Sequence, residues 1–273
     1  MMSPAWNTTT LEFEAEALQV LSELRSKRWL SRGQSKRYGG LVPSIDRDGR
    51  HVLSRIEKLK LERQSIELFR STARFFADPG ERGALGDDIV ALMVLRHYGV
   101  PSRLLDWSMS PYVSAYFAAE GRDDEHGEIW TFDEPLYEEL GSDQWKLWPQ
   151  TTTDHSGSRD RFDAKLTAFT SEEPPDWFIC DFYTPGFHRQ NAQDGAYTMT
   201  ARLGRDHADA ITNLLVESSH YHRYVVRSGL KAELRKSLRE NRSIWRGSLF
   251  PDSAGAAETA RTVFLGSDVD EPS

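Results

Sequence analysis

The spacing of apolar residues changes from helical to strand-like along the chain. Apolar side chains recur every three or four positions in residues 11–24, 56–76 and 87–98, which predicts three helices. Further on, β-branched and aromatic residues are concentrated in four segments that we expect to be strands, namely residues 127–132, 177–183, 195–200 and 221–227. Residues 229–241 predict another helix, and residues 254–265 a short one.

Short-range signals mark several helix ends. Asp87 or Asp88 can cap the third helix, and Gly99 suits the left-handed position beyond its last turn. The pair Ser110-Pro111 predicts the start of a further helix. Residues 29–33 read as a short strand that ends at a glycine. This order of helices followed by strands favours an α+β fold over a doubly wound parallel sheet.

We expect a single domain over residues 1–273. Residues 11–98 would be mostly helical around the strand that carries Arg32 and Gly33. Residues 133–176 combine tryptophans, a threonine run and a Pro-Pro pair, which predicts an irregular insertion or a flap over a binding site. Residues 252–273 read as an acidic tail.

Composition restricts the class of protein. The hydrophobic fraction of 38% is typical of a globular chain. Cys180 is the only cysteine, so the chain has neither an internal disulfide nor a thiolate zinc site. The chain lacks an apolar run of about 20 residues, the length that spans a bilayer, and its N-terminus lacks the pattern of a signal peptide. We therefore expect a cytoplasmic protein without membrane association.

The distribution of charge points to a ligand of limited size. A net charge of −8 argues against a surface devoted to nucleic acid. However, residues 25–37 contain six basic residues and no acid, and residues 223–246 contain eight basic residues and two acids. Two basic patches on an acidic protein favour a phosphate-bearing ligand, although solvated helix faces are an equal explanation for the second patch.

Three stretches of the sequence resemble the FRG domain family. The first is Trp-Leu-Ser-Arg-Gly-Gln-Ser at residues 29–35, followed by Leu-Val-Pro-Ser at 41–44; the phenylalanine of the family motif is altered. The second and most specific is Arg-His-Tyr-Gly-Val-Pro-Ser-Arg-Leu-Leu-Asp-Trp-Ser at 96–108, which continues into Ala-Tyr-Phe-Ala at 115–118. A weaker third stretch comprises Arg189, Gln193, Gly195 and Tyr197, and Leu-Phe-Pro-Asp at 249–252 also fits. Together they span residues 29–255.

The family pattern is itself similar to the ADP-ribosyltransferase fold. In that fold an Arg-Gly ends an early strand, a Ser-Thr-Ser-like strand leads into a helix, and a late Glu or Gln follows. Arg32-Gly33, Asp106-Trp107-Ser108 and Gln193 stand in this order. The similarity implies a mixed-sheet core with an N-terminal helical region, and an enzyme that uses NAD as substrate.

The resemblance also implies an activity and a set of residues. The chain would cleave NAD and transfer ADP-ribose to a protein or nucleic acid, as a toxin or antiviral defence protein with a possible antitoxin or regulatory partner. The implied catalytic residues are Arg32, His97, Asp106 and Gln193. The implied NAD contacts are Arg32, Gly33, Gln34, Tyr98, Arg103, Trp107 and Ser108, and no metal is implied.

Each of these assignments has an alternative. Arg32 could hold a pyrophosphate with its planar fork, or form a buried salt bridge with Asp106. His97 could act as a general base or cap its helix, and Trp107 could stack on a ring or belong to the core. Arg103 and Asp106 could form a structural pair.

The enzyme hypothesis is weakest at Gln193, because glutamine cannot supply the negative charge that stabilises an oxocarbenium ion. The competing hypotheses are a non-catalytic module that binds a nucleotide or nucleic acid in the same pocket, and a pseudo-enzyme that binds a protein. We expect Arg32 and Asp106 to lie in one pocket with residues of the segment 97–108, because the two strongest motif matches should converge if they mark function.

Overall fold

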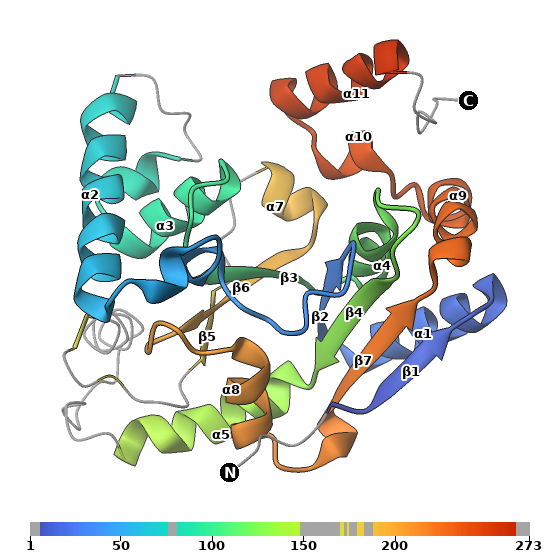
Figure 1. Ribbon diagram of the computed structural model, residues 1–273, viewed down its shortest axis with the longest axis horizontal. Helices are drawn as coiled ribbons and strands as arrows, with labels where there is room; N and C mark the ends of the chain where they lie inside the picture. Colours follow the sequence, from blue (N-terminus) through green and yellow to red (C-terminus); the bar gives the residue numbers. More distant parts are fainter. Residues whose placement is uncertain are drawn as a thin grey trace.

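A seven-stranded mixed sheet forms the centre of the protein (Figure 1). The computed structural model describes residues 6–75, 81–147, 170–171, 174, 179–182 and 188–265. The strands are β1 (Thr8–Leu11), β2 (Leu30–Gln34), β3 (Leu104–Ser108), β4 (Gly127–Phe132), β5 (Ile179–Phe182), β6 (Gly195–Thr200) and β7 (Tyr221–Val226). Their order is β1-β7-β4-β2-β3-β6-β5, in which β1 and β7 are parallel and the other neighbouring pairs are antiparallel.

Helices cover both faces of this sheet. The α-helices are α1 (Glu14–Lys27), α2 (Arg55–Ala73), α3 (Asp88–His97), α4 (Pro111–Ala119), α5 (Glu134–Leu147), α7 (His188–Ala192), α8 (His207–Leu214), α9 (Lys231–Arg242), α10 (Arg246–Leu249) and α11 (Ser253–Leu265). The 3-10 turns are η1 (Ser44–Asp46), η2 (Arg50–Val52), η3 (Arg82–Leu85), η4 (Ser218–His220) and η5 (Ser228–Leu230). No helix in these described ranges is long and apolar enough to cross a membrane.

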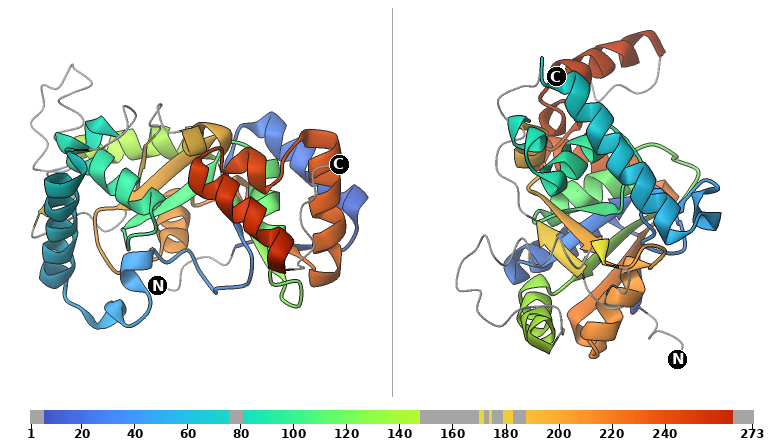
Figure 2. Two further views of the ribbon diagram at one scale, coloured as in Figure 1. Left: turned by 90° about the horizontal axis from the view of Figure 1, so that it is seen from above. Right: turned by 90° about the vertical axis from the view of Figure 1, so that its left-hand side faces the viewer.

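The side chains of β4 alternate between the two faces of the sheet and contribute to a separate apolar core on each face. Ile129 packs with buried residues of α1, α4 and α9, whereas Trp130 and Phe132 pack with Tyr137 of α5 and Ile211 of α8. Because neighbouring strand residues point to opposite faces, these clusters lie on the two sides of the sheet. A third cluster joins α2 and α3 to β3 and β6. Figure 2 shows α2 on one side of the molecule and α1 and α9 on the other.

The sheet opens between its two central strands. Five residue pairs connect β2 to β4 and five connect β3 to β6, but β2 and β3 pair only at Ser31 and Ser108. Beyond that pair the strands separate, and the guanidinium of Arg32 donates a hydrogen bond to the backbone oxygen of Asp106. A side-chain hydrogen bond thus takes the place of backbone pairing between β2 and β3 at this point. The opening between the two strands leaves room for a binding site.

Most elements agree with the sequence-based expectations. The mixed helix and strand fold is confirmed, as are the strands β2, β4, β6 and β7 and the helices α2, α3 and α9. The side chain of Asp87 caps α3 at Ile89 and Val90, and Gly99 has the expected positive φ of 80°. Ser110 precedes α4, but its side chain makes no capping hydrogen bond.

The expectation of an irregular insertion or flap at residues 133–176 is wrong in part. Residues 134–147 of the expected insertion form α5, and Tyr137 of this helix is buried against the sheet, so this part is neither irregular nor a flap. Residues 148–169 lie outside the described residues. The short helix expected at residues 254–265 forms as α11, and residues 266–273 of the expected acidic tail lie outside the described part.

Gly33 is required for the packing of β2 against α4. A Cβ at this position would lie 1.9 Å from the backbone oxygen of Ser114. Overpacking a core typically costs roughly 1–3 kcal/mol of stability. We expect Gly33→Ala to lie at the upper end of this range, because the clashing atom belongs to the backbone of α4 and cannot rotate away as a side chain could. Urea denaturation measures this cost. Gly86→Ala is the control, since a Cβ there meets nothing within 4 Å, and an equal effect of both changes would contradict the account.

Candidate functional site

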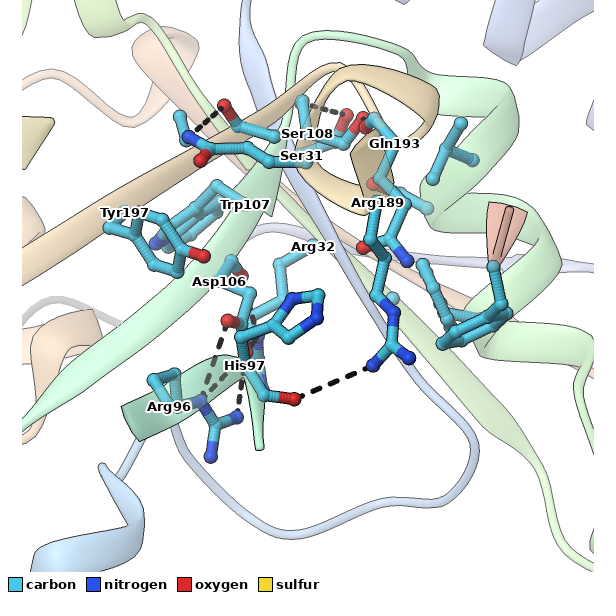
Figure 3. A pocket seen from close by; sticks show the side chains of 18 of the residues that line it. Ser31, Arg32, Arg96, His97, Asp106, Trp107, Ser108, Arg189, Gln193 and Tyr197 are labelled. Carbon is cyan, nitrogen blue, oxygen red and sulfur yellow. Dashed lines mark hydrogen bonds and ion pairs between the residues drawn. The ribbon is translucent and has the colours of Figure 1, made fainter. Parts of the chain in front are cut away.

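A cavity of about 350 Å³ occupies the opening between β2 and β3 (Figure 3). Its walls come from β2, β3, β6, α4, α7, the end of α3 and Phe250. All four expected catalytic residues, Arg32, His97, Asp106 and Gln193, line it. The expectation that Arg32 and Asp106 share a pocket with residues of the segment 97–108 is therefore confirmed. The motif stretches, far apart in sequence, meet at one place.

Two arginines hold the carboxylate of Asp106 at the floor of this cavity. Arg96 donates from Nε and Nη2 to Oδ2, at 3.1 and 2.6 Å, and the Nη1 of Arg32 lies 3.5 Å from the same oxygen. The Asp106 side chain nevertheless keeps 43% of its surface exposed. Desolvation alone would raise the pKa of Asp106, but Arg96 and Arg32 hold it below its usual value. The carboxylate is thus ionised and accessible at neutral pH.

Arg32 contributes a buried positive charge. Desolvation lowers the pKa of Arg32 to about 10, against the opposing effect of Asp106, and Arg96 and Arg47 lower it further. It therefore stays protonated near neutral pH. Two guanidinium groups face a single carboxylate here, so the cavity floor carries a positive excess that favours an anionic ligand.

The alternative in which Arg103 forms a structural pair with Asp106 is wrong. The guanidinium of Arg103 is buried and donates from Nε to Glu62 of α2, at 2.8 Å. Asp106 instead takes its main partner, Arg96, from the last turn of α3. The sequence left Arg32 and Arg103 open as partners of Asp106, whereas the packing of α3 beside β3 adds Arg96, ten residues away.

Three of the expected NAD contacts lie outside the cavity lining. Arg103 is occupied as just described. Tyr98 is exposed and its hydroxyl donates to Glu81, while Gln34 is buried and donates from its amide to the backbone oxygen of Gly40. Tyr98 and Gln34 are next to lining residues in the chain but do not line the cavity. They are thus structural neighbours of the site.

His97 lies in the cavity wall at the end of α3. Burial lowers the pKa of His97 below its ordinary 6.5, and the nearby charge of Arg189 lowers it further. The imidazole is therefore mainly neutral at pH 7, the form that accepts a proton. The backbone oxygen of His97 accepts a hydrogen bond from Arg189 at 3.4 Å, which ties α3 to α7 across the cavity.

The C-terminal part of the chain closes one wall. The Gln193 amide donates to the backbone oxygen of Leu249, at 3.0 Å, and its own backbone oxygen accepts from the Ser108 hydroxyl, at 2.6 Å. Arg189 binds Asp252 at 2.8 Å, and its guanidinium lies 4.8 Å from the centre of the Phe250 ring. Gln193 is thus fixed in place. Sequence reasoning assigned no role to Arg96, Arg189 or Phe250, although all three belong to the motif stretches.

Trp107 is mainly a core residue. Only 3% of its surface is exposed, and its indole nitrogen donates to the Thr198 hydroxyl at 2.7 Å. The Thr198 hydroxyl also forms a hydrogen bond with Nδ1 of His207, at 2.8 Å. Burial lowers the pKa of His207 to about 3, so this histidine is neutral and can accept. The chain of hydrogen bonds fixes the indole, and its burial leaves little of the ring available for stacking on a ligand.

Comparison with known proteins agrees with the first two motif stretches. The model of the FRG domain family matches residues 27–127, which include β2, α2, α3, β3 and α4. Neither a curated protein nor a solved structure matches the chain. The third stretch, with Arg189 and Gln193, follows the matched segment and meets it at the cavity. Residues 27–127 therefore match the FRG domain family, and Arg32, Arg96 and Asp106 lie within the matched segment.

Proposed function

We propose that the cavity binds NAD, cleaves the bond between nicotinamide and ribose, and transfers ADP-ribose to a macromolecular target. One observation carries the proposal: Arg32, His97, Asp106 and Gln193 surround a single cavity. A volume of about 350 Å³ is at the small end of ligand pockets and suits the nicotinamide ribose better than a whole dinucleotide.

The state of Asp106 fits the cleavage step. When the C1′–N bond breaks, its electron pair leaves with neutral nicotinamide and positive charge develops on the ribose. An accessible carboxylate that stays ionised stabilises this charge electrostatically. Because Arg96 and Arg32 hold the pKa of Asp106 low, it is a poor proton acceptor and its role is electrostatic. In this mechanism Asp106 supplies the charge that Gln193 lacks.

The arginines fit the other half of the substrate. Arg32 and Arg96 share one carboxylate, so the positive excess remains available to the pyrophosphate of NAD. Charge-assisted hydrogen bonds to phosphate oxygens are stronger than neutral ones. The two alternatives for Arg32, a phosphate ligand and a partner of Asp106, are compatible in this arrangement.

His97 suits the role of general base toward the acceptor group, which must lose a proton as it attacks C1′. Its lowered pKa has a testable consequence. Protonation at low pH removes the base, so the rate of ADP-ribose transfer should fall as pH drops through a value below 6.5. The pKa of Asp106 lies below its ordinary 3.8, so Asp106 does not contribute to a change in rate in this pH range.

The measurement is a pH profile of transfer for the wild type and for His97→Gln. We expect the variant to lose the acid limb and to transfer about 100-fold more slowly, the lower end of the usual contribution of a general base. If the fall in rate at low pH persists unchanged in His97→Gln, a group other than His97 causes it.

Nicotinamide release tests the proposed activity itself. Purified protein is incubated with NAD, nicotinamide is quantified by mass spectrometry, and transfer to a cell extract is followed with biotin-labelled NAD. We expect release together with labelling of a macromolecule. A toxin or antiviral role would follow from this activity, and expression in cells should then arrest growth.

The competing function is a non-catalytic module that binds a nucleotide or nucleic acid, which the glutamine at position 193 and the basic cavity favour. It predicts no release of nicotinamide and no NAD-dependent thermal shift. It predicts instead binding of RNA or DNA that weakens steeply with salt.

A further inference from the structure

The loop after β2 brings a further arginine near Arg96, which lines the cavity. This loop, residues 35–52, contains η1, and the Ser44 hydroxyl of η1 accepts hydrogen bonds from the Ser102 backbone at 3.0 Å and from Nη1 of Arg96 at 3.3 Å. In Figure 3 the blue segment after β2 curves around the side of the cavity where Arg96 lies. The turn η1 is therefore attached to the arginine that binds Asp106.

Arg47 follows directly after η1. Its backbone nitrogen donates to the backbone oxygen of Ser44, and its Nε donates to Val42, at 2.6 Å. The guanidinium lies 5.4 Å from the centre of the Tyr38 ring. Within the described ranges Arg47 forms no ion pair, so its two terminal nitrogens keep their capacity to bind an anion.

The charges around Arg47 are unbalanced. Burial lowers the pKa of Arg47, and repulsion from Arg96 is the next contribution, while Arg47 and Arg96 both lower the pKa of Arg32. Asp106 already binds Arg96 and Arg32. The carboxylate of Asp48, near Arg47 in the chain, is bonded to Arg50 at 3.1 Å. The ion pairs with Asp106 thus involve Arg32 and Arg96, and Arg47 adds a third positive charge near them.

We propose that Arg47 and Arg96 form a phosphate-binding subsite for the ADP half of the nucleotide. The cavity is small for a whole dinucleotide, so the ADP portion must extend beyond it, and the line from Arg32 through Arg96 to Arg47 is a positively charged route. Tyr38, with 47% of its surface exposed, offers an aromatic ring beside this route. The assignment of the anion to ADP rests on the proposed function. The affinity of the subsite for phosphate is independent of that function.

Calorimetric titration with ADP tests the subsite without any chemical step. We expect Arg47→Gln to weaken ADP binding at least about tenfold, because it removes charge-assisted hydrogen bonds to phosphate. Arg47→Lys should bind with intermediate affinity, since it keeps the charge and loses the planar fork. The matched control is Arg37→Gln, an exposed arginine of the same loop that is bonded to Glu128 at 3.3 Å. Melting temperatures verify that each variant folds.

Two outcomes would overturn the subsite: ADP affinity unchanged in folded Arg47→Gln, or reduced equally in Arg37→Gln. The wild type failing to bind ADP would also overturn it. Failure of the proposed function is separate and visible as absence of nicotinamide release. Binding of ADP that depends on Arg47 supports the subsite even without release, whereas release with a KM for NAD that is unchanged in Arg47→Gln rejects it and leaves the enzyme intact.

Discussion

Replacing Asp106 with asparagine is expected to lower the rate of nicotinamide release from NAD by about 100- to 1000-fold, the usual effect of removing one preorganised electrostatic group. The amide keeps the shape of the side chain and one acceptor oxygen for Arg96. It removes the negative charge that faces the cavity and opposes two arginines. The loss should appear in kcat, because the charge acts on the transition state more than on bound NAD.

The matched control is Asp123→Asn, which removes a carboxylate bonded to Arg235 at 2.7 Å in the turn between α4 and β4, outside the cavity lining. It should leave release unchanged. Thermal melting of both variants separates loss of activity from loss of folding. Release by folded Asp106→Asn within about threefold of the wild type would exclude Asp106 as the electrostatic group, since a missing transition-state charge costs far more.

Replacing Glu62 with leucine is expected to destabilise the protein by about 3–5 kcal/mol, the typical effect of breaking a buried ion pair. Side-chain exposure is 8% for Glu62 and 2% for Arg103, so the guanidinium left behind cannot reach water. Glu62 also opposes the charge of Arg55, whose pKa is lowered to about 10 by burial and by Arg103. Its removal therefore leaves two adjacent positive charges. Urea denaturation of Glu62→Leu against the wild type measures the cost.

Two further variants sharpen this test. Glu125→Leu breaks an exposed pair with Arg122 and should change the free energy of unfolding by no more than about 0.5 kcal/mol. The double variant with Arg103→Met removes both buried charges and should recover a large part of the lost stability. A Glu62→Leu protein as stable as the wild type would mean that the pair contributes nothing to the fold.

Local sequence patterns were sufficient for elements that carry their own signals. Helix α3 has an apolar pattern, a capping aspartate and a terminal glycine, and it forms as expected. Strand β1 was missed, because its four residues pair with β7 more than 200 positions away and Leu11 resembled the start of a helix. Helix α5 was missed although Asp133 accepts a hydrogen bond from its first turn and Pro135 suits that turn. Because this helix contains a tryptophan, its sequence was interpreted as part of an irregular segment.

Site residues that belong to sequence motifs could be predicted. Contacts that depend on how helices and strands pack could not. Arg32, His97, Asp106 and Gln193 were chosen from motif positions, and the fold brings them together. Neither the pairing of Asp106 with Arg96 nor the role of Gly33 could be read from the sequence. The first depends on where the last turn of α3 meets β3, and the second on the approach of α4 to β2, where no Cβ fits.

A crystal structure with a non-hydrolysable NAD analogue tests the central claim most directly, that the opening between β2 and β3 is the nucleotide site. We expect the nicotinamide ribose beside the carboxylate of Asp106, and the phosphates on the side of Arg32 and Arg96. An analogue bound away from this cavity, or no bound analogue at a concentration that saturates the protein in solution, would contradict the account.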